Sequence, residues 1–85
     1  MHGYAALFAP PREPTLAHLA ALRLTYAALE NYFACHCAMP AISELAEIMG
    51  ISTPTVSRRL IDMEQLGWIS RDTSRQRSIV LRGTK

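Results

Sequence analysis

Arginine is concentrated in the second half of this 85-residue chain. Residues 52–85 carry six arginines and Lys85 against three acidic residues, whereas residues 1–51 carry two arginines against four glutamates. The planar guanidinium group can form paired hydrogen bonds with phosphate and with guanine. The total net charge is only +2, so the uneven distribution is what indicates an anion-binding surface. A basic face that only contacts solvent is the alternative.

Two short helices joined by a tight turn would position these groups. Gly50 is placed to end the first helix, because glycine adopts the left-handed conformation without a Cβ clash. Ser52 can cap a second helix that runs to Leu66, in which Val56 and Leu60 begin a buried stripe at helical spacing. The opposite face of that helix consists of residues that a core does not need, which are Pro54, Thr55, Ser57, Arg58 and Asp62, with Arg59 at its margin.

A hairpin is expected after this pair of helices. Residues 68–72 and 77–82 have the composition of strands, and Ile79 and Leu81 alternate with polar or outward positions as one covered sheet face requires. The turn between the strands is basic as well as polar. A helix-turn-helix followed by such a hairpin is a winged helix.

A long helix should precede these elements, from Thr15 to about His36. Alanine and leucine favour helix there, and Thr15 can serve as its N-cap. The buried face is expected to contain Leu19, Leu22, Tyr26, Leu29 and Phe33. Other apolar residues, including Leu16 and Leu24, lie off that stripe, which is a hint of a dimer.

These elements predict a mainly α-helical fold of three helices with a small β-hairpin, a winged helix-turn-helix over residues 15–85. Residues 1–14 are interpreted as an N-terminal arm, since Gly3 and three prolines prevent a long helix. Tyr4, Leu7 and Phe8 are too apolar for an idle tail. The arm therefore either folds back on the core or covers a partner subunit.

The segment Cys35-His36-Cys37 raises the question of a metal site. Structural zinc requires four ligands, usually from two spaced pairs, and no second pair is present. His2 and His18 have no matching spacing. We therefore expect no metal and no cofactor, although a metal or redox sensor built on the two cysteines is an alternative function.

Catalysis is not expected. A catalytic site would need a nucleophile with a base, or paired carboxylates, and Asp62, Glu64 and Asp72 show no such pairing. No stretch approaches the roughly 20 apolar residues of a membrane span, and the N-terminus lacks the features of a signal peptide. We expect reduced cysteines and a cytoplasmic protein without a membrane partner.

From Met39 to Leu81 the chain resembles the winged-helix DNA-binding domain of LexA-type repressors, and more loosely that of MarR-type regulators. The segments that carry the resemblance are Met39-Pro40, Glu44-Leu45-Ala46, Met49-Gly50-Ile51-Ser52, Thr55-Val56-Ser57-Arg58-Arg59-Leu60 and Leu66-Gly67-Trp68-Ile69. The resemblance implies that the helix beginning at Ser52 enters the DNA major groove. The chain ends at Lys85, so the protease domain of LexA and its cleavage switch are not expected.

The expected function is sequence-specific binding of double-stranded DNA. The chain would act as a small plasmid- or phage-type transcriptional repressor that binds a palindromic operator as a homodimer. A winged-helix protein-interaction module without base readout is the alternative. The expected DNA-binding residues are Ser52, Thr53, Pro54, Thr55, Ser57, Arg58, Arg59, Asp62, Arg71, Thr73, Ser74, Arg75, Gln76 and Arg77.

Overall fold

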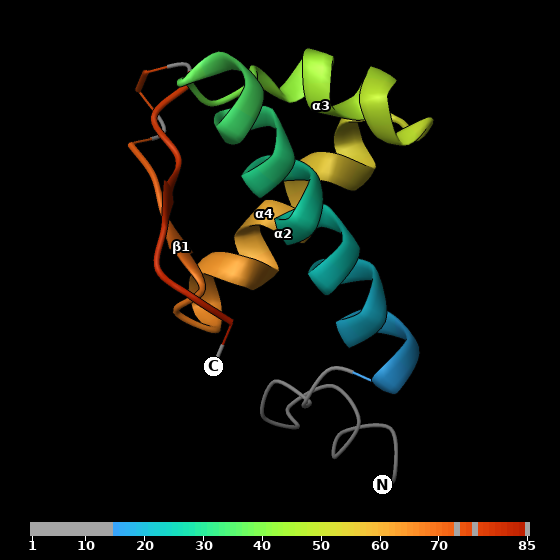
Figure 1. The fold of residues 1–85 in the computed structure, drawn as a ribbon. Coiled ribbons are helices and arrows are strands. Elements are labelled where there is room, and N and C mark those ends of the chain that lie inside the picture. The colour runs from blue at the N-terminus through green and yellow to red at the C-terminus, as the bar shows by residue number, and fades with distance from the viewer. Residues whose placement is uncertain (1–14, 73, 76, 85) are drawn as a thin grey trace, which may run out of the picture.

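The computed structural model describes residues 15–72, 74, 75 and 77–84, and within them it confirms the expected fold class. Three helices, α2 (Leu16–His36), α3 (Ile42–Met49) and α4 (Thr53–Gln65), are followed by strands β1 (Ile69–Ser70) and β2 (Val80–Leu81) (Figure 1). In Figure 1, α2 passes in front of α4, α3 crosses near one end of α2, and the hairpin lies along one side. The predicted arm, residues 1–14, lies outside the described residues.

Helix α2 supplies one side of the core. The hydroxyl oxygen of Thr15 accepts a hydrogen bond from the His18 N–H at 3.1 Å, so the helix begins where its sequence predicts. Leu22 and Leu29 are fully buried, as expected from their spacing. Phe33 was expected to be buried with them, and this prediction is wrong because 49% of its surface is exposed.

Helices α3 and α4 form the helix-turn-helix. Gly50 has a φ of 69°, the left-handed conformation that ends α3. The side chain of Ser52 then accepts from the Thr55 N–H at 3.3 Å and caps α4. Val56 and Leu60 have no exposed surface, and burial of such side chains stabilises the fold by roughly 1.5–3 kcal/mol each.

Helix α3 begins without a hydroxyl cap. Its N-cap residue is Ala41, whose N–H donates to the Glu44 carboxylate at 2.8 Å. This bond is half of a capping box, since alanine has no oxygen to return the second half. Ser43, the nearest hydroxyl residue, lies inside the helix and is not its N-cap.

The hairpin is shorter than the sequence suggests. Its strands pair antiparallel with Ile69 opposite Leu81 and Ser70 opposite Val80, so the predicted strands over 68–72 and 77–82 are too long. Toward the turn, the Asp72 N–H donates to the Ser78 hydroxyl at 3.0 Å, and that hydroxyl donates to the Asp72 carbonyl at 2.7 Å. These side-chain bonds replace the ladder bonds that a longer pair of strands would make.

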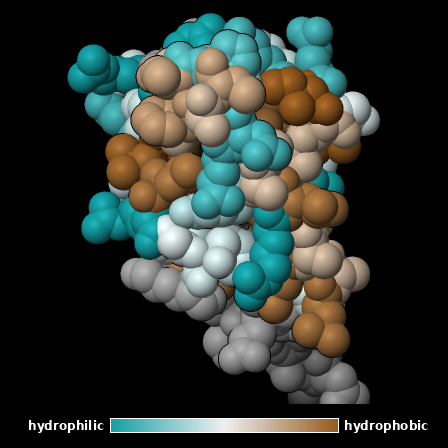
Figure 2. Space-filling model, viewed as in Figure 1, coloured by the Kyte–Doolittle hydropathy of each residue, from teal (hydrophilic) through white to brown (hydrophobic). Residues whose placement is uncertain are grey.

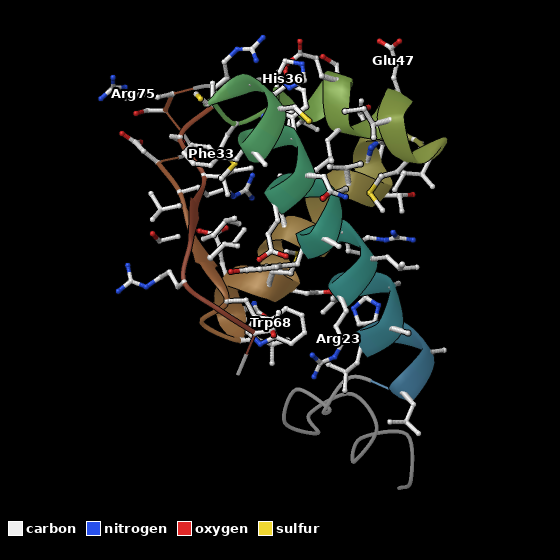
Figure 3. All side chains as sticks on the ribbon, in the orientation of Figure 1. Arg23, Phe33, His36, Glu47, Trp68 and Arg75 are labelled. Atoms are coloured by element: carbon white, nitrogen blue, oxygen red, sulfur yellow. The ribbon has the colours of Figure 1, made fainter. Side chains whose placement is uncertain are left out.

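The hairpin is fixed to α2 around Trp68, which is 1% exposed. Its ring meets the ring of Tyr26 edge-on with centroids 6.4 Å apart, and the Arg23 guanidinium lies 5.3 Å from the indole centroid (Figure 3). The Tyr26 hydroxyl accepts from the Gly83 N–H at 2.8 Å. Helix α2 and the hairpin are therefore packed together as one unit. Within the described part of the chain, no helix is long and apolar enough to cross a membrane.

Candidate nucleic-acid interface

The exposed side of α4 is a narrow stripe that begins at Thr53 and Pro54. Pro54 and Arg58 are exposed, and Ile61, with 47% of its surface exposed, and Gln65 continue the same stripe. Ser57 lies half-buried beside it. Pro54, Ser57 and Arg58 are expected on this side from the sequence, whereas Ile61 and Gln65 are not. Their i+3 and i+7 spacing from Arg58 was the available signal.

Arg59 and Asp62, also expected to contact DNA, face α2 instead. Arg59 Nη1 donates to the Thr25 hydroxyl oxygen at 3.2 Å, and the Asp62 carboxylate lies 2.7 Å from His18 Nε2. Thr25 is fully buried, so the Arg59 contact satisfies a polar group inside the fold. The structure therefore separates these two residues from the exposed stripe and places them at the junction of two helices.

A groove of about 440 Å³ lies where the starts of α3 and α4 meet the hairpin turn. The residues that line it include Ala41, Ile42 and Ser43 from α3, Thr53 from α4, and Ser74 and Arg75 from the turn. Unsatisfied N–H groups give each helix N-terminus a partial positive charge. The lining combines these two helix starts, which favour anions, with arginines of the hairpin and with the acidic Asp72.

Two of the arginines around the groove are already paired. Arg77 Nη1 lies 2.6 Å from the Glu44 carboxylate and donates to the Met39 carbonyl at 3.2 Å. Arg71 Nε donates to the Glu64 carboxylate at 2.8 Å, and its side chain is 11% exposed. Both residues were expected to contact DNA. The structure shows them fixing the hairpin to α3 and α4.

The Arg77–Glu44 pair affects both groups. The hydrogen bond from Arg77, followed by that from the Ala41 N–H, lowers the pKa of Glu44. The same bond to Glu44, with a smaller contribution from Tyr32, raises the pKa of Arg77. Each group therefore favours the charged form of the other, and the pair remains ionised at neutral pH.

Arg75 differs from these two arginines. It is exposed at the hairpin turn, and Figure 3 shows its side chain extending away from the helices. The turn is organised by Asp72, whose carboxylate accepts from the Ser74 N–H at 3.0 Å and from the Ser74 hydroxyl at 2.6 Å. These bonds lower the pKa of Asp72. Thr73 and Gln76, expected at the same turn, lie outside the described residues.

The two cysteines lie at the end of α2, where Cys35 is in the last turn and Cys37 is the C-cap residue. Both thiols are exposed, and Cys37 has a φ of 55°. Among the residues that the structure describes, no three His, Cys, Asp or Glu side chains are grouped to hold a metal ion.

A family of known domains matches the part of the chain that carries this geometry. The family described as Crp-like helix-turn-helix domain matches residues 34–84, more than half of the chain. Comparison with curated proteins gave no match. The family match confirms a helix-turn-helix DNA-binding domain. It does not support the LexA-type or MarR-type resemblance specifically. The chain belongs to the family of Crp-like helix-turn-helix domains.

Proposed function

We propose that the chain is a transcriptional repressor that binds a palindromic operator in double-stranded DNA as a homodimer. The observation that carries the proposal is an exposed stripe on the second helix of a helix-turn-helix, next to a groove lined by the starts of α3 and α4 and by the hairpin turn. A recognition helix needs its exposed side chains in the major groove while neighbouring groups hold the phosphate backbone. Repression would then follow from occupancy of the operator. The cytoplasmic location remains a prediction.

Arg58 is the residue proposed to read the base sequence. It is exposed on α4 in the second turn after the Ser52 cap, where a groove-inserted helix presents side chains to base edges. A bidentate contact between arginine and guanine contributes about 1–3 kcal/mol of discrimination against a wrong base. Ile61 on the same stripe has the apolar surface that contacts a thymine methyl group.

Arg75 is proposed to bind the phosphate backbone or a narrow minor groove. Its position in the turn of a two-stranded hairpin suits a contact that does not depend on base identity. Ser52, Thr53 and Thr55, at the start of α4, would approach the phosphates beside the groove.

The experiment begins with selection of binding sites from a random duplex pool. Binding of Arg58→Ala and Arg75→Ala is then measured on the selected operator, on single-base variants and on random duplex at two salt concentrations. Arg58→Ala should lose about tenfold or more on the operator and relax specificity at one position of each half-site. Arg75→Ala should weaken operator and random DNA by similar factors, with a salt slope shallower by about one.

Arg82→Ala is the matched control. Arg82 is exposed after β2, at the opposite end of the hairpin from the turn, so its replacement should leave base preference unchanged. All three variants should melt near the temperature of the parent chain, because the replaced side chains are exposed. Selection that yields no sequence preference, or equal binding of single strands, would refute the proposed function.

A further inference from the structure

The side of α2 that points away from α4 is exposed and uncharged from one end of the helix to the other. Leu24, in its middle, exposes 66% of its surface. We call this stripe the α2 seam, and its exposed residues are Ala17, Ala20, Leu24, Ala27, Asn31 and Ala34. Figure 2 shows apolar residues along the lower right of the molecule, where the first half of α2 lies in Figure 1.

The seam lies opposite the contacts that α2 makes inside the fold. His18 and Thr25 reach α4, and Tyr26 reaches the wing. Because successive residues of an α-helix are turned by roughly 100°, Ala20, Leu24 and Ala27 lie on the far side of the helix from those residues. A partner on the seam would therefore leave the exposed stripe of α4 accessible to DNA.

The spacing of the seam is that of helix pairing. Its residues follow one another in alternating steps of three and four, which is the heptad pattern by which two helices keep one face in contact. Alanine at four of the six positions allows two backbones to approach closely. Leu24 supplies a large side chain that alanine positions on a facing helix could receive.

Charges beside the seam indicate what pairs with it. Arg23 and Glu30 are exposed along the same edge, seven residues apart and of opposite sign. In the single chain the Arg23 guanidinium lies 5.3 Å from the Trp68 ring centroid, so pairing with a partner's Glu30 requires it to turn from the indole toward the seam. If two copies of α2 pair antiparallel about a two-fold axis between Leu24 and Ala27, each Arg23 lies near the partner's Glu30, and this contact forms twice. Parallel pairing would place Arg23 near the partner's Ala28 and leave the charges without a counterpart.

We propose that the α2 seam is the homodimer interface, with the two copies of α2 antiparallel and two Arg23–Glu30 ion pairs along one edge. This inference rests on the proposed homodimer and gives it a surface and an orientation. Its tests measure self-association in the absence of DNA. Self-association through another surface would overturn the inference and leave the proposed homodimer standing. A monomeric chain would overturn both the interface and the homodimer, and DNA binding is measured separately.

The first test is sedimentation of the full chain over a range of concentrations. The parent chain should be dimeric at tens of micromolar, and Leu24→Glu should weaken association at least tenfold. Ile48→Glu is the matched control, because Ile48 exposes 55% of its surface on α3, away from the seam. Equal association of Leu24→Glu and the parent, or a monomeric parent, would overturn the proposal. Circular dichroism establishes that each variant is folded.

Charge exchange tests the antiparallel orientation. Glu30→Arg should weaken the dimer, since it faces the partner's Arg23. The double variant Arg23→Glu/Glu30→Arg should recover association relative to Glu30→Arg alone. Failure of the second change to recover it would contradict the proposed pairing.

Disulfide cross-linking tests the same orientation without altered charge. In a Cys35→Ser/Cys37→Ser background, the variant Ala17→Cys/Ala34→Cys should form a covalent dimer under mild oxidation. Ala34→Cys alone should not, because antiparallel pairing separates the two copies of residue 34 by about 25 Å along the helix axis. A covalent dimer from Ala34→Cys alone would show parallel helices and refute the proposal.

Discussion

Arg58 and Arg59 are adjacent in the sequence and have different surroundings. Arg58 is exposed on α4, whereas Arg59 donates to the buried Thr25 hydroxyl of α2. From the sequence, both residues are expected on the DNA-binding side, with Arg59 at its margin. Periodicity identified Pro54 and Arg58 as exposed, but it could not show that the Thr25 hydroxyl of α2 accepts a hydrogen bond from Arg59. The Asp62–His18 contact was missed for the same reason.

Cys37 provides a prediction at the scale of one residue. It ends α2 with a φ of 55°, where a residue with a Cβ costs about 1–2 kcal/mol. Glycine avoids that cost but loses more conformational entropy on folding. Cys37→Gly should therefore stabilise the fold by about 0.5–1 kcal/mol and raise the melting temperature by a few degrees.

Thermal unfolding in reducing buffer measures this effect. Cys35→Gly is the control, because Cys35 lies within the last turn of α2 and glycine there should destabilise by about 1 kcal/mol. If both variants lower the melting temperature, the left-handed conformation of Cys37 does not measurably destabilise the fold.

At the scale of elements, the signals that worked were local. The Thr15 and Ser52 caps and the glycine at residue 50 fixed the helix boundaries, because each acts within one turn of itself. The strands were less predictable. Asp72 and Ser78 bond to each other across the hairpin and end the ladder early, and strand composition alone does not contain that information. The exposure of Phe33 likewise depends on where other elements end.

The attachment of the wing to α3 should depend on pH through Glu44. Its pKa in the folded chain lies below the usual 4.5, so the charged form contributes stability that is complete above pH 4.5 and is lost as the pH falls through the folded pKa. The parent chain should melt higher than Glu44→Gln at neutral pH, and this difference should close below pH 4.5.

Melting curves of both chains from neutral to acidic pH test the Glu44 contribution. Asp72, whose pKa is also lowered, is present in both chains and cancels in the comparison. Glu47→Gln, at an exposed position of α3, is the control for removal of one negative charge from the same helix. A gap between the parent and Glu44→Gln that stays constant into acid would contradict the role of the ion pair.

At the scale of the whole molecule, DNA binding and self-association should be linked. A dimer that neutralises about six phosphates should show a log–log salt slope near −5, because each contact contributes about −0.9. If the α2 seam joins the two DNA-binding units, monomeric Leu24→Glu should retain about half of that slope. Binding isotherms at several salt concentrations measure both values, and an unchanged slope in the variant would show that the seam does not set the number of contacts.

The packing around Trp68 gives the chain an optical reporter. It is the sole tryptophan, it is 1% exposed, and it lies where α2 meets the hairpin. Any displacement of the hairpin from α2 would admit water to the indole and move its fluorescence emission to longer wavelength. The natural sequence can thus report on the position of the wing during a titration with DNA, with no attached dye and no substitution.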